Sequence, residues 1–206
     1  MRNQVLRTAA ALVLLAGAWM LAVRLQRLAP SRDASDGGDR RIVCMSPAVV
    51  ELAFAIGAGD RVVGVSAHTM HPPEALSRPL CGGFFDPNYE AILSLRPDLI
   101  VTQGRAEDLQ RFAGHNGIAL LSLDIVGLES ILTEARRLGE VLDSRAGAER
   151  LCADIQARLD AVRARVAGRP PVSVLLVTAR EPGALNGLQA VGPGGFLDDL
   201  IGLAGG

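Results

Sequence analysis

The chain has 206 residues, of which 49% are hydrophobic and only 3% aromatic, so it can build an aliphatic core in one large or two small domains. Its formal net charge is −1, and its 21 basic residues, all arginine, are interspersed with 22 acids. This balance supplies no field that would recruit nucleic acid or an anionic membrane surface, and no nucleic-acid partner is expected.

An apolar run near the start, Thr8–Val23, follows Arg2 and Arg7. A positive start before an apolar stretch is the layout of a secretory signal. A helix over this run would span about 24 Å, less than the ~30 Å hydrocarbon core of a membrane. We therefore predict that residues 1–28 are a signal peptide, or a membrane anchor if they are not cleaved, and that the protein is exported. Residues 29–40, rich in Asp, Ser and Gly, are predicted to be a linker.

Short apolar runs alternate with helix-start signals over residues 41–126. Four runs are predicted to be strands buried on both faces: Ile42–Met45, Val62–Ser66, Leu99–Thr102 and Ile118–Leu123. Helices are predicted from Ser46-Pro47 to Gly57 or Gly59, from Tyr89 to before Pro97, and from Glu107 to Asn116. Ser46 and Asn88 are the expected N-cap residues. The alternation of strand and helix predicts an α/β lobe with a parallel sheet.

Residues 127–169 are predicted to be almost entirely helical, with interruptions at Gly139 and at Asp143-Ser144, where Ser144 can cap a new start. The helix over Arg145–Val166 would be about 33 Å long, enough to connect two lobes. Residues 170–206 are expected to begin a second lobe.

The second lobe is expected to contain a strand over Val172–Thr178 and a helix over Phe196–Leu203. One strand and one helix cannot close an α/β lobe. We therefore expect the sequence to be a fragment, and residues 41–206 alone to bind ligand weakly or not at all and to aggregate through exposed strand edges.

Three cysteines are too few for a disulfide framework, and no Cys-x-x-Cys zinc spacing occurs. Cys44 ends the first predicted strand and Cys81 precedes a Gly-Gly loop. If both lie at one edge of the sheet, they could form a disulfide in an exported protein. The alternative is three buried free thiols, with Cys152 in a helix.

Several motifs follow one another in a specific order from Arg41 to the end of the chain. They are Ser46-Pro47 after the first strand, Pro72-Pro73 after the second, Gly82-Gly83 with Pro87-Asn88 and Glu90, Leu95-Arg96-Pro97-Asp98-Leu99-Ile100-Val101, and Gly192-Pro-Gly-Gly before the last helix. Together they resemble the periplasmic substrate-binding proteins of ABC importers that bind iron–siderophore, haem or vitamin B12.

The resemblance implies two Rossmann-like α/β lobes joined by a long backbone helix, with the second lobe incomplete in this chain. It implies a periplasmic protein that captures a metal chelate (a ferric siderophore, cobalamin or haem) in a cleft between the lobes. The chelate would be delivered to an ABC permease with its ATPase. No catalytic residues, no bound structural metal and no resident cofactor are expected, and membrane contact would come only through the N-terminal segment.

The expected ligand contacts come from loops that follow the strands, since ligands of open α/β sheets bind outside the carboxyl ends of the strands. His68 and His71 form a His-x-x-His pair, in which either histidine could ligate haem iron or hydrogen-bond a siderophore or corrin side chain, although two surface histidines are the simpler interpretation. His71 is the better candidate of the two, because it directly precedes Pro72-Pro73, where members of the resembling family often carry tyrosine. Phe84 and Phe85 follow the Gly-Gly turn, and at least one is expected to face the cleft. Arg105 could pair with an anionic group of the ligand.

Glu90 is the expected docking residue for the permease, because the resembling family docks through a glutamate at this position. A carboxylate in the first turn of a helix also stabilises that helix by about 0.3–1 kcal/mol, so a purely structural role remains open. The alternative function is a metal-binding chaperone or an enzyme that uses His68 and His71 on the same fold.

Overall fold

The computed structural model describes residues 40–181, 183 and 186–206. The described residues belong to one compact unit, residues 37–206. The predicted signal or anchor over 1–28, and the linker as far as residue 39, lie outside the described residues. No helix in the described part is long and apolar enough to cross a membrane.

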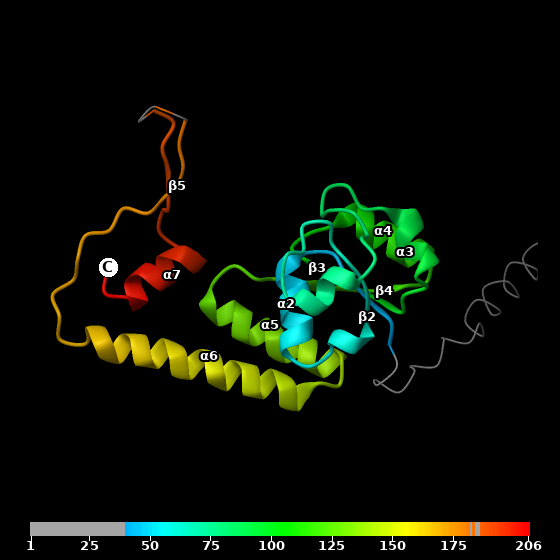
Figure 1. Cartoon of the computed structure of the whole chain (residues 1–206), viewed down its shortest axis with the longest axis horizontal. Coiled ribbons are helices and arrows are strands. Elements are labelled where there is room, and N and C mark those ends of the chain that lie inside the picture. Colours follow the sequence, from blue (N-terminus) through cyan, green and yellow to red (C-terminus); the bar gives the residue numbers. More distant parts are fainter. Residues whose placement is uncertain (1–39, 182, 184–185) are drawn as a thin grey trace, which may run out of the picture. The chain divides into compact units, whose positions relative to one another are not determined.

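Four parallel strands form the central sheet, in the spatial order β2-β1-β3-β4. Three of them, β2, β3 and β4, are labelled in Figure 1. Their bounds are β1 (Ile42–Cys44), β2 (Val62–Val65), β3 (Leu99–Gln103) and β4 (Ala119–Leu123). In register, Ile42 pairs with Leu99, and Leu99 pairs with Ala119. Every residue of β1 is buried, as its continuous apolar run predicts for a strand covered on both faces. The predicted α/β lobe with a parallel sheet is therefore confirmed.

Helices cover both faces of this sheet and create two separate cores. The elements are α2 (Pro47–Ala55), α3 (Tyr89–Ser94), α4 (Glu107–His115), α5 (Leu128–Val141) and α6 (Arg145–Val166), with 3-10 turns η2 (Gly59–Arg61) and η3 (Pro73–Ser77). Ile42 and Cys44 pack in one core with α2, α5 and α6, while Val43 and Met45 pack in the other with α3 and α4. Alternate residues of a strand point to opposite faces, which explains this division.

The two cores also answer the question about the cysteines. Cys44 lies in the core with α2, whereas Cys81 lies in the core with α3, and both thiols are free. A disulfide needs Cβ atoms that point toward each other, so side chains in the cores on opposite faces of a sheet do not form one. Cys152 is also free and buried, and the alternative of three buried thiols is the one that the structure supports.

Two predicted helix starts are confirmed by their capping bonds. The Ser46 hydroxyl accepts a hydrogen bond from the Val49 N–H (3.3 Å), and the Asn88 side chain accepts one from the Ala91 N–H (3.0 Å). Such caps satisfy N–H groups that have no partner within the helix. Ser46 follows the buried residues of β1 and turns the chain out of the sheet into α2, whereas Asn88 starts α3 after the exposed loop residues Phe85 and Asp86.

One expectation for the helical region is confirmed in position and another is wrong. Ser144 is the N-cap residue of α6, although its hydroxyl makes no capping bond and instead accepts a hydrogen bond from the Arg61 guanidinium (2.6 Å). Gly139 does not interrupt a helix but lies inside α5. A Cβ added to Gly139 would lie 2.5 Å from the Ala148 Cβ, so this glycine lets α5 and α6 pack closely.

The segment after α6 contains an antiparallel pair, β5 (Val177–Ala179) with β6 (Gln189–Ala190), followed by α7 (Phe196–Leu203). The predicted strand over Val172–Thr178 is therefore mostly wrong. The Val172 N–H donates to the Gly205 carbonyl (3.0 Å), and residues 172–176 belong to no strand of the structure. The division into 41–126, 127–169 and 170–206 stays a prediction, since residues 37–206 form one compact unit.

Candidate functional site

The carboxyl edge of the sheet between β1 and β3 is the position where an open α/β sheet binds ligands. The connection after β1 is α2, on one face, and the connection after β3 is α4, on the other face. The chain therefore passes outward from β1 to β2 on one side of the sheet and from β3 to β4 on the other side, so the direction of strand addition reverses between β1 and β3. The loops that leave this edge diverge, and such a switch point leaves a crevice for a ligand.

The loop after β2 and the loop around Gly82 lie side by side at the carboxyl end of β2, where Leu80 pairs with Val65. The Ala67 N–H donates to the Gly82 carbonyl (2.9 Å), and Gly82 forms a bridge with Pro87 across the tip of its own loop. Gly82 has φ +81°, and an added Cβ would lie 2.4 Å from the Asp86 carbonyl oxygen. Only glycine fits there, and the resulting tight loop presents the residues between Gly82 and Pro87.

The two phenylalanines in this loop differ in exposure, as expected for adjacent residues in an extended segment. Phe85 is 93% exposed, while Phe84 is half-buried. Their rings meet edge to face with centroids 5.1 Å apart, a favourable aromatic geometry. An apolar ring that is held in this way offers a stacking surface to a flat, partly apolar ligand.

The structure places the two predicted histidines against different segments. His68 lies beside the Gly82 loop, with its Nε2 3.6 Å from where a Cβ on Gly83 would stand. His71 instead lines a hollow of about 540 Å³ that Glu51, Phe54 and other residues of α2, η2 and η3 border. Both are exposed, and the part of the chain that the structure describes contains no group of three or more His, Cys, Asp or Glu side chains able to hold a metal ion.

Arg105 follows β3 and lines a hollow of about 230 Å³ together with Glu107, Gln110 and Ser122. The helix that starts here, α4, has Ala106 at its N-cap and no side chain that caps it. Free N–H groups at a helix start and a nearby guanidinium both favour an anion. Ser122 is not free to bind one, because its hydroxyl donates to the Gly104 carbonyl (2.5 Å).

Glu90 is exposed and lies in the first turn of α3, as the sequence predicts. The Tyr89 ring next to it packs on the ring of Phe112 of α4, with centroids 4.4 Å apart, which anchors the start of the helix. No hydrogen bond or ion pair is observed for the Glu90 carboxylate among the described residues. The carboxylate is accessible to a partner from solvent.

Sequence reasoning missed a buried hydroxyl close to the switch point. Thr102 is fully buried near the end of β3, and its Oγ1 has no hydrogen-bond partner among the described residues. It pairs in register with Ser122 of β4. Burial of an unpaired hydroxyl costs about 1–3 kcal/mol. A threonine within an apolar strand is the only sequence signal for it, and that signal is weak.

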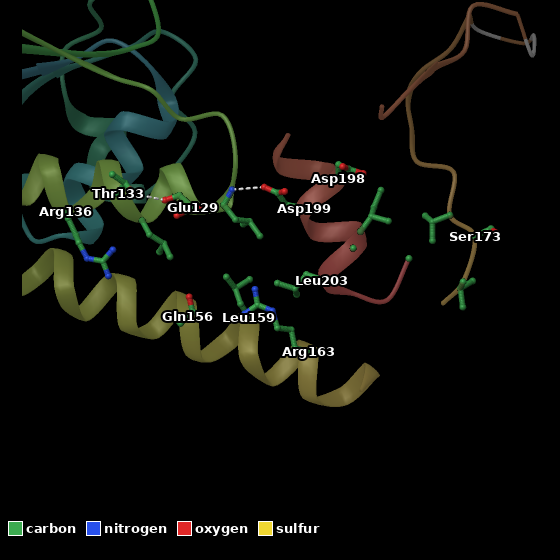
Figure 2. Close-up of a pocket in the computed structure, with 17 residues that line it drawn as sticks. Glu129, Thr133, Arg136, Gln156, Leu159, Arg163, Ser173, Asp198, Asp199 and Leu203 are labelled. Carbon is green, nitrogen blue, oxygen red and sulfur yellow. Dashed lines mark hydrogen bonds between the residues drawn. The ribbon is translucent and has the colours of Figure 1, made fainter. Parts of the chain in front are cut away.

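A larger hollow, of about 1220 Å³, is bordered by α5, α6, α7 and the segment around Ser173 (Figure 2). Its wall is mixed, with Leu132 and Leu159 beside Arg136, Gln156 and Arg163. No sequence motif marks this hollow, because its lining comes from four separate segments.

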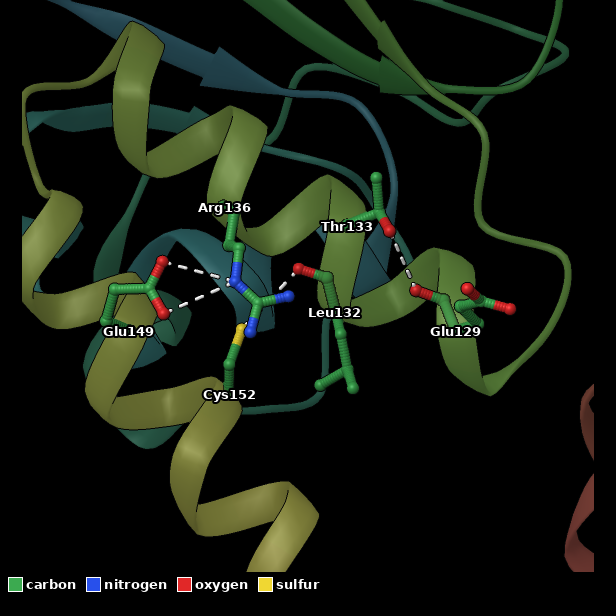
Figure 3. Close-up of polar contacts among 6 residues, drawn as sticks. All are labelled: Glu129, Leu132, Thr133, Arg136, Glu149 and Cys152. Carbon is green, nitrogen blue, oxygen red and sulfur yellow. Dashed lines mark hydrogen bonds and ion pairs between the residues drawn. The ribbon is translucent and has the colours of Figure 1, made fainter.

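Cys152 lies under this region but is not a reactive thiol. Its Sγ is 3.5 Å from the Leu132 carbonyl oxygen, beside the ion pair of Arg136 and Glu149 (3.2 Å; Figure 3). Burial raises the pKa of the Cys152 thiol, and Glu149 adds to the rise while Arg136 opposes it. Only the thiolate is an effective nucleophile, so this cysteine has a packing role.

Comparisons with known proteins agree with this architecture. The vitamin B12-binding protein of Pectobacterium carotovorum is 31% identical over 130 residues, which cover 60% of this chain and 46% of that protein. The vitamin B12-binding protein of Salmonella typhimurium is 32% identical over 144 residues, or 69% of this chain and 53% of that protein. The chain spans about half the length of these relatives.

Among solved structures, the periplasmic haem-binding protein RhuT from Roseiflexus sp. RS-1 aligns with a TM-score of 0.68 and 31% identity, over 82% of this chain and 65% of that one. Residues 42–206 match the family described as periplasmic binding protein. The match covers the sheet, the linking helices and the segment that contains β5 to α7. The chain belongs to the periplasmic binding protein family.

Proposed function

We propose that the chain is the substrate-binding component of an ABC importer, which captures a metal chelate in the periplasm and passes it to a permease with its ATPase. The observation that carries this proposal is that the loops of His68 and Phe85 lie side by side beyond the carboxyl end of β2, at the edge where open α/β sheets bind ligands. The relatives are named for binding vitamin B12 or haem, and none of those reported above is named for a reaction.

The chemistry of this edge suits a large chelate that is partly apolar. Phe84 and Phe85 supply rings and Arg105 supplies a cation, while the Ser66 hydroxyl is buried and hydrogen-bonded to that of Thr69 (3.1 Å). Haem and cobalamin combine a flat macrocycle with polar side groups, and both match this mixture of apolar and polar protein groups. A ferric siderophore is the third ligand that the proposal includes.

His68 and His71 are the two candidates for an axial ligand to iron. The contacts favour His68, because it lies beside the loop that carries Phe84 and Phe85. His71 would need a ligand that reaches the hollow along α2. Glu90 is proposed as the docking residue for the permease, and residues 1–28 as the export signal or anchor.

A spectroscopic titration tests the proposal. The chain is titrated with haemin, cyanocobalamin and a ferric hydroxamate, and the visible absorption spectrum and the quenching of protein fluorescence are followed. Weak but saturable binding of one chelate, weakened further by Phe85→Ala and Arg105→Ala, is expected. The matched control is Leu76→Ala, which truncates an exposed apolar residue of η3. Weakening by Leu76→Ala to the same degree would remove the assignment of the strand-end loops.

A further inference from the structure

The first turn of α5 receives its capping acceptor from a helix that lies much later in the chain. The Leu128 N–H donates to the Asp199 carboxylate Oδ2 at 3.0 Å, across a sequence separation of 71 residues (Figure 2). The N-cap residue of α5 is Gly127, which has no side chain of its own to accept this bond. A carboxylate at this end of a helix both satisfies a free N–H and complements the helix dipole.

A second hydrogen bond joins the same two segments. The Phe196 N–H, at the start of α7, donates to the Val126 carbonyl at 3.1 Å. Val126 and Leu128 flank Gly127, so α7 is attached on both sides of that glycine, once through its backbone and once through Asp199. A Cβ on Gly127 would lie 2.8 Å from Asp199 Oδ2, closer than side chains normally approach, so the contact also depends on the glycine.

The attachment point is itself held firmly. The Ser130 hydroxyl accepts hydrogen bonds from the Val126 N–H (2.9 Å) and the Gly127 N–H (3.0 Å). This turn directly follows β4, at the carboxyl edge of the sheet. The other partner, α7, belongs to the segment that follows the long helix α6. The turn Val126–Leu128 and the helix α7 are thus joined by two hydrogen bonds.

We propose that the contact of Val126–Leu128 with Phe196–Asp199 is a conformational clasp, in which the Asp199 carboxylate fixes the start of α7 against the turn that follows β4. The inference does not depend on the proposed function. It predicts that removal of one carboxylate changes the placement of a whole helix relative to the sheet.

The neighbouring residue provides a control of identical charge. The Asp198 carboxylate accepts a hydrogen bond from the Gly194 N–H (2.8 Å), within the turn that precedes α7. Asp198→Ala therefore removes a local bond and one negative charge, while Asp199→Ala removes the long-range bond and the same charge.

The first experiment measures amide hydrogen exchange by NMR in the 206-residue chain. In Asp199→Ala, the Leu128 and Phe196 amides should exchange faster by about five- to tenfold, the factor expected for loss of an N-cap. Asp199→Asn should stay close to the parent, because its amide oxygen still accepts a hydrogen bond. Asp198→Ala should leave Leu128 unchanged. An unaltered Leu128 rate in Asp199→Ala would overturn the clasp.

A double-mutant cycle adds a variant that disturbs the same contact from the other side. Gly127→Ala places a methyl group 2.8 Å from Asp199 Oδ2, closer than side chains normally approach, and the backbone at Gly127 (φ −149°) accepts alanine without strain. It should speed exchange at Leu128 about as much as Asp199→Ala, and the double variant should show no further increase. Two independent, additive effects would show that the residues do not act together.

A distance measurement reports the placement of α7 directly. Spin labels are attached at Gly114→Cys in α4 and Gly202→Cys in α7, since an added side chain at either site meets open space. The three native thiols are buried and do not compete for the label. The distance distribution should broaden in Asp199→Ala and in Gly127→Ala, and remain narrow in Asp198→Ala. The same distribution in all four chains would refute the proposal.

Discussion

The Arg61 guanidinium donates a hydrogen bond to the Leu142 carbonyl, which joins the 3-10 turn before β2 to the end of α5 across 81 residues of sequence. Another guanidinium nitrogen of Arg61 donates to the Ser144 hydroxyl (2.6 Å). Leu142 is the C-cap residue of α5, where carbonyl groups lack partners within the helix and the helix dipole favours a cation. The half-buried Arg61 side chain thus supplies a donor to the C-terminal end of α5 and also binds Ser144, the residue before α6.

Arg61→Ala is accordingly expected to lower the free energy of unfolding by about 2 kcal/mol, since hydrogen bonds to charged groups contribute about 1.5–3 kcal/mol each. Chemical denaturation followed by circular dichroism measures the change. Arg111→Ala is the control, because its ion pair with Asp108 is exposed and such pairs contribute about 0–1 kcal/mol. Equal losses in the two variants would mean that Arg61 is only another surface charge.

Gly139→Ala should destabilise the chain by about 1–3 kcal/mol, the usual cost of an extra methyl group in a packed interface. The added Cβ would lie 2.5 Å from the Ala148 Cβ of α6, and both helices would have to move apart. Gly114→Ala in α4 is the matched control, since its Cβ meets open space and alanine is the better helix former by about 1 kcal/mol. Thermal melting should therefore show opposite shifts for the two substitutions.

The two buried thiols near the sheet predict a loss of stability at alkaline pH. Burial raises the pKa of the Cys44 thiol from about 9 to about 12, with a smaller contribution from Cys81, and burial raises the pKa of Cys81 to about 11. Above pH 9 the unfolded chain releases these protons while the native chain keeps them. The free energy of unfolding should thus be unaffected by these groups below pH 9 and fall as the pH rises from 9 toward 12.

Denaturation midpoints measured between pH 8 and pH 11 test this sign. In Cys44→Ala the midpoint should fall less steeply above pH 9 than in the parent chain, although the variant is less stable at pH 8. Iodoacetamide should modify the native thiols only at the rate of global or local opening. Parallel pH profiles for the parent and the variant would exclude Cys44 as a source of the pH dependence.

Local signals in the sequence predicted the sheet, while long-range contacts decided where the predictions failed. Ser46 and Asn88 cap their helices because each acts on an N–H three residues away. Ser144 has the same chemistry, but the distant Arg61 engages its hydroxyl, which nothing in the local sequence reveals. Gly139 suggested a break by composition, yet it is retained inside a helix by its contact with Ala148.

The candidate site was predictable to a similar extent. The Gly-Gly turn indicated a tight loop, and the different exposure of Phe84 and Phe85 follows from alternation along an extended segment. The spacing of His68 and His71 did not reveal that His71 lies along α2. The bond between Asp199 and Leu128 was beyond reach, because it depends on where α7 lies after the whole chain has folded.

The last prediction concerns Glu90, which the proposed function assigns to permease docking. Glu90→Arg reverses an exposed charge in the first turn of α3 and should leave chelate affinity within about twofold, because an isolated surface charge contributes little to stability or to a distant site. It should slow association with permease vesicles and make that association less dependent on salt, as expected for a charge at the rim of an interface.

Glu129→Arg is the control, since Glu129 is also exposed in the first turn of a helix, α5, and the substitution reverses its charge in the same way. Any general cost of a cation at such a position appears in both variants. Association rates with the permease, measured by surface plasmon resonance at low and physiological salt, should fall only for Glu90→Arg. If Glu90→Arg instead abolishes chelate binding, Glu90 belongs to the ligand site, and if both variants associate normally, it serves only to stabilise its helix.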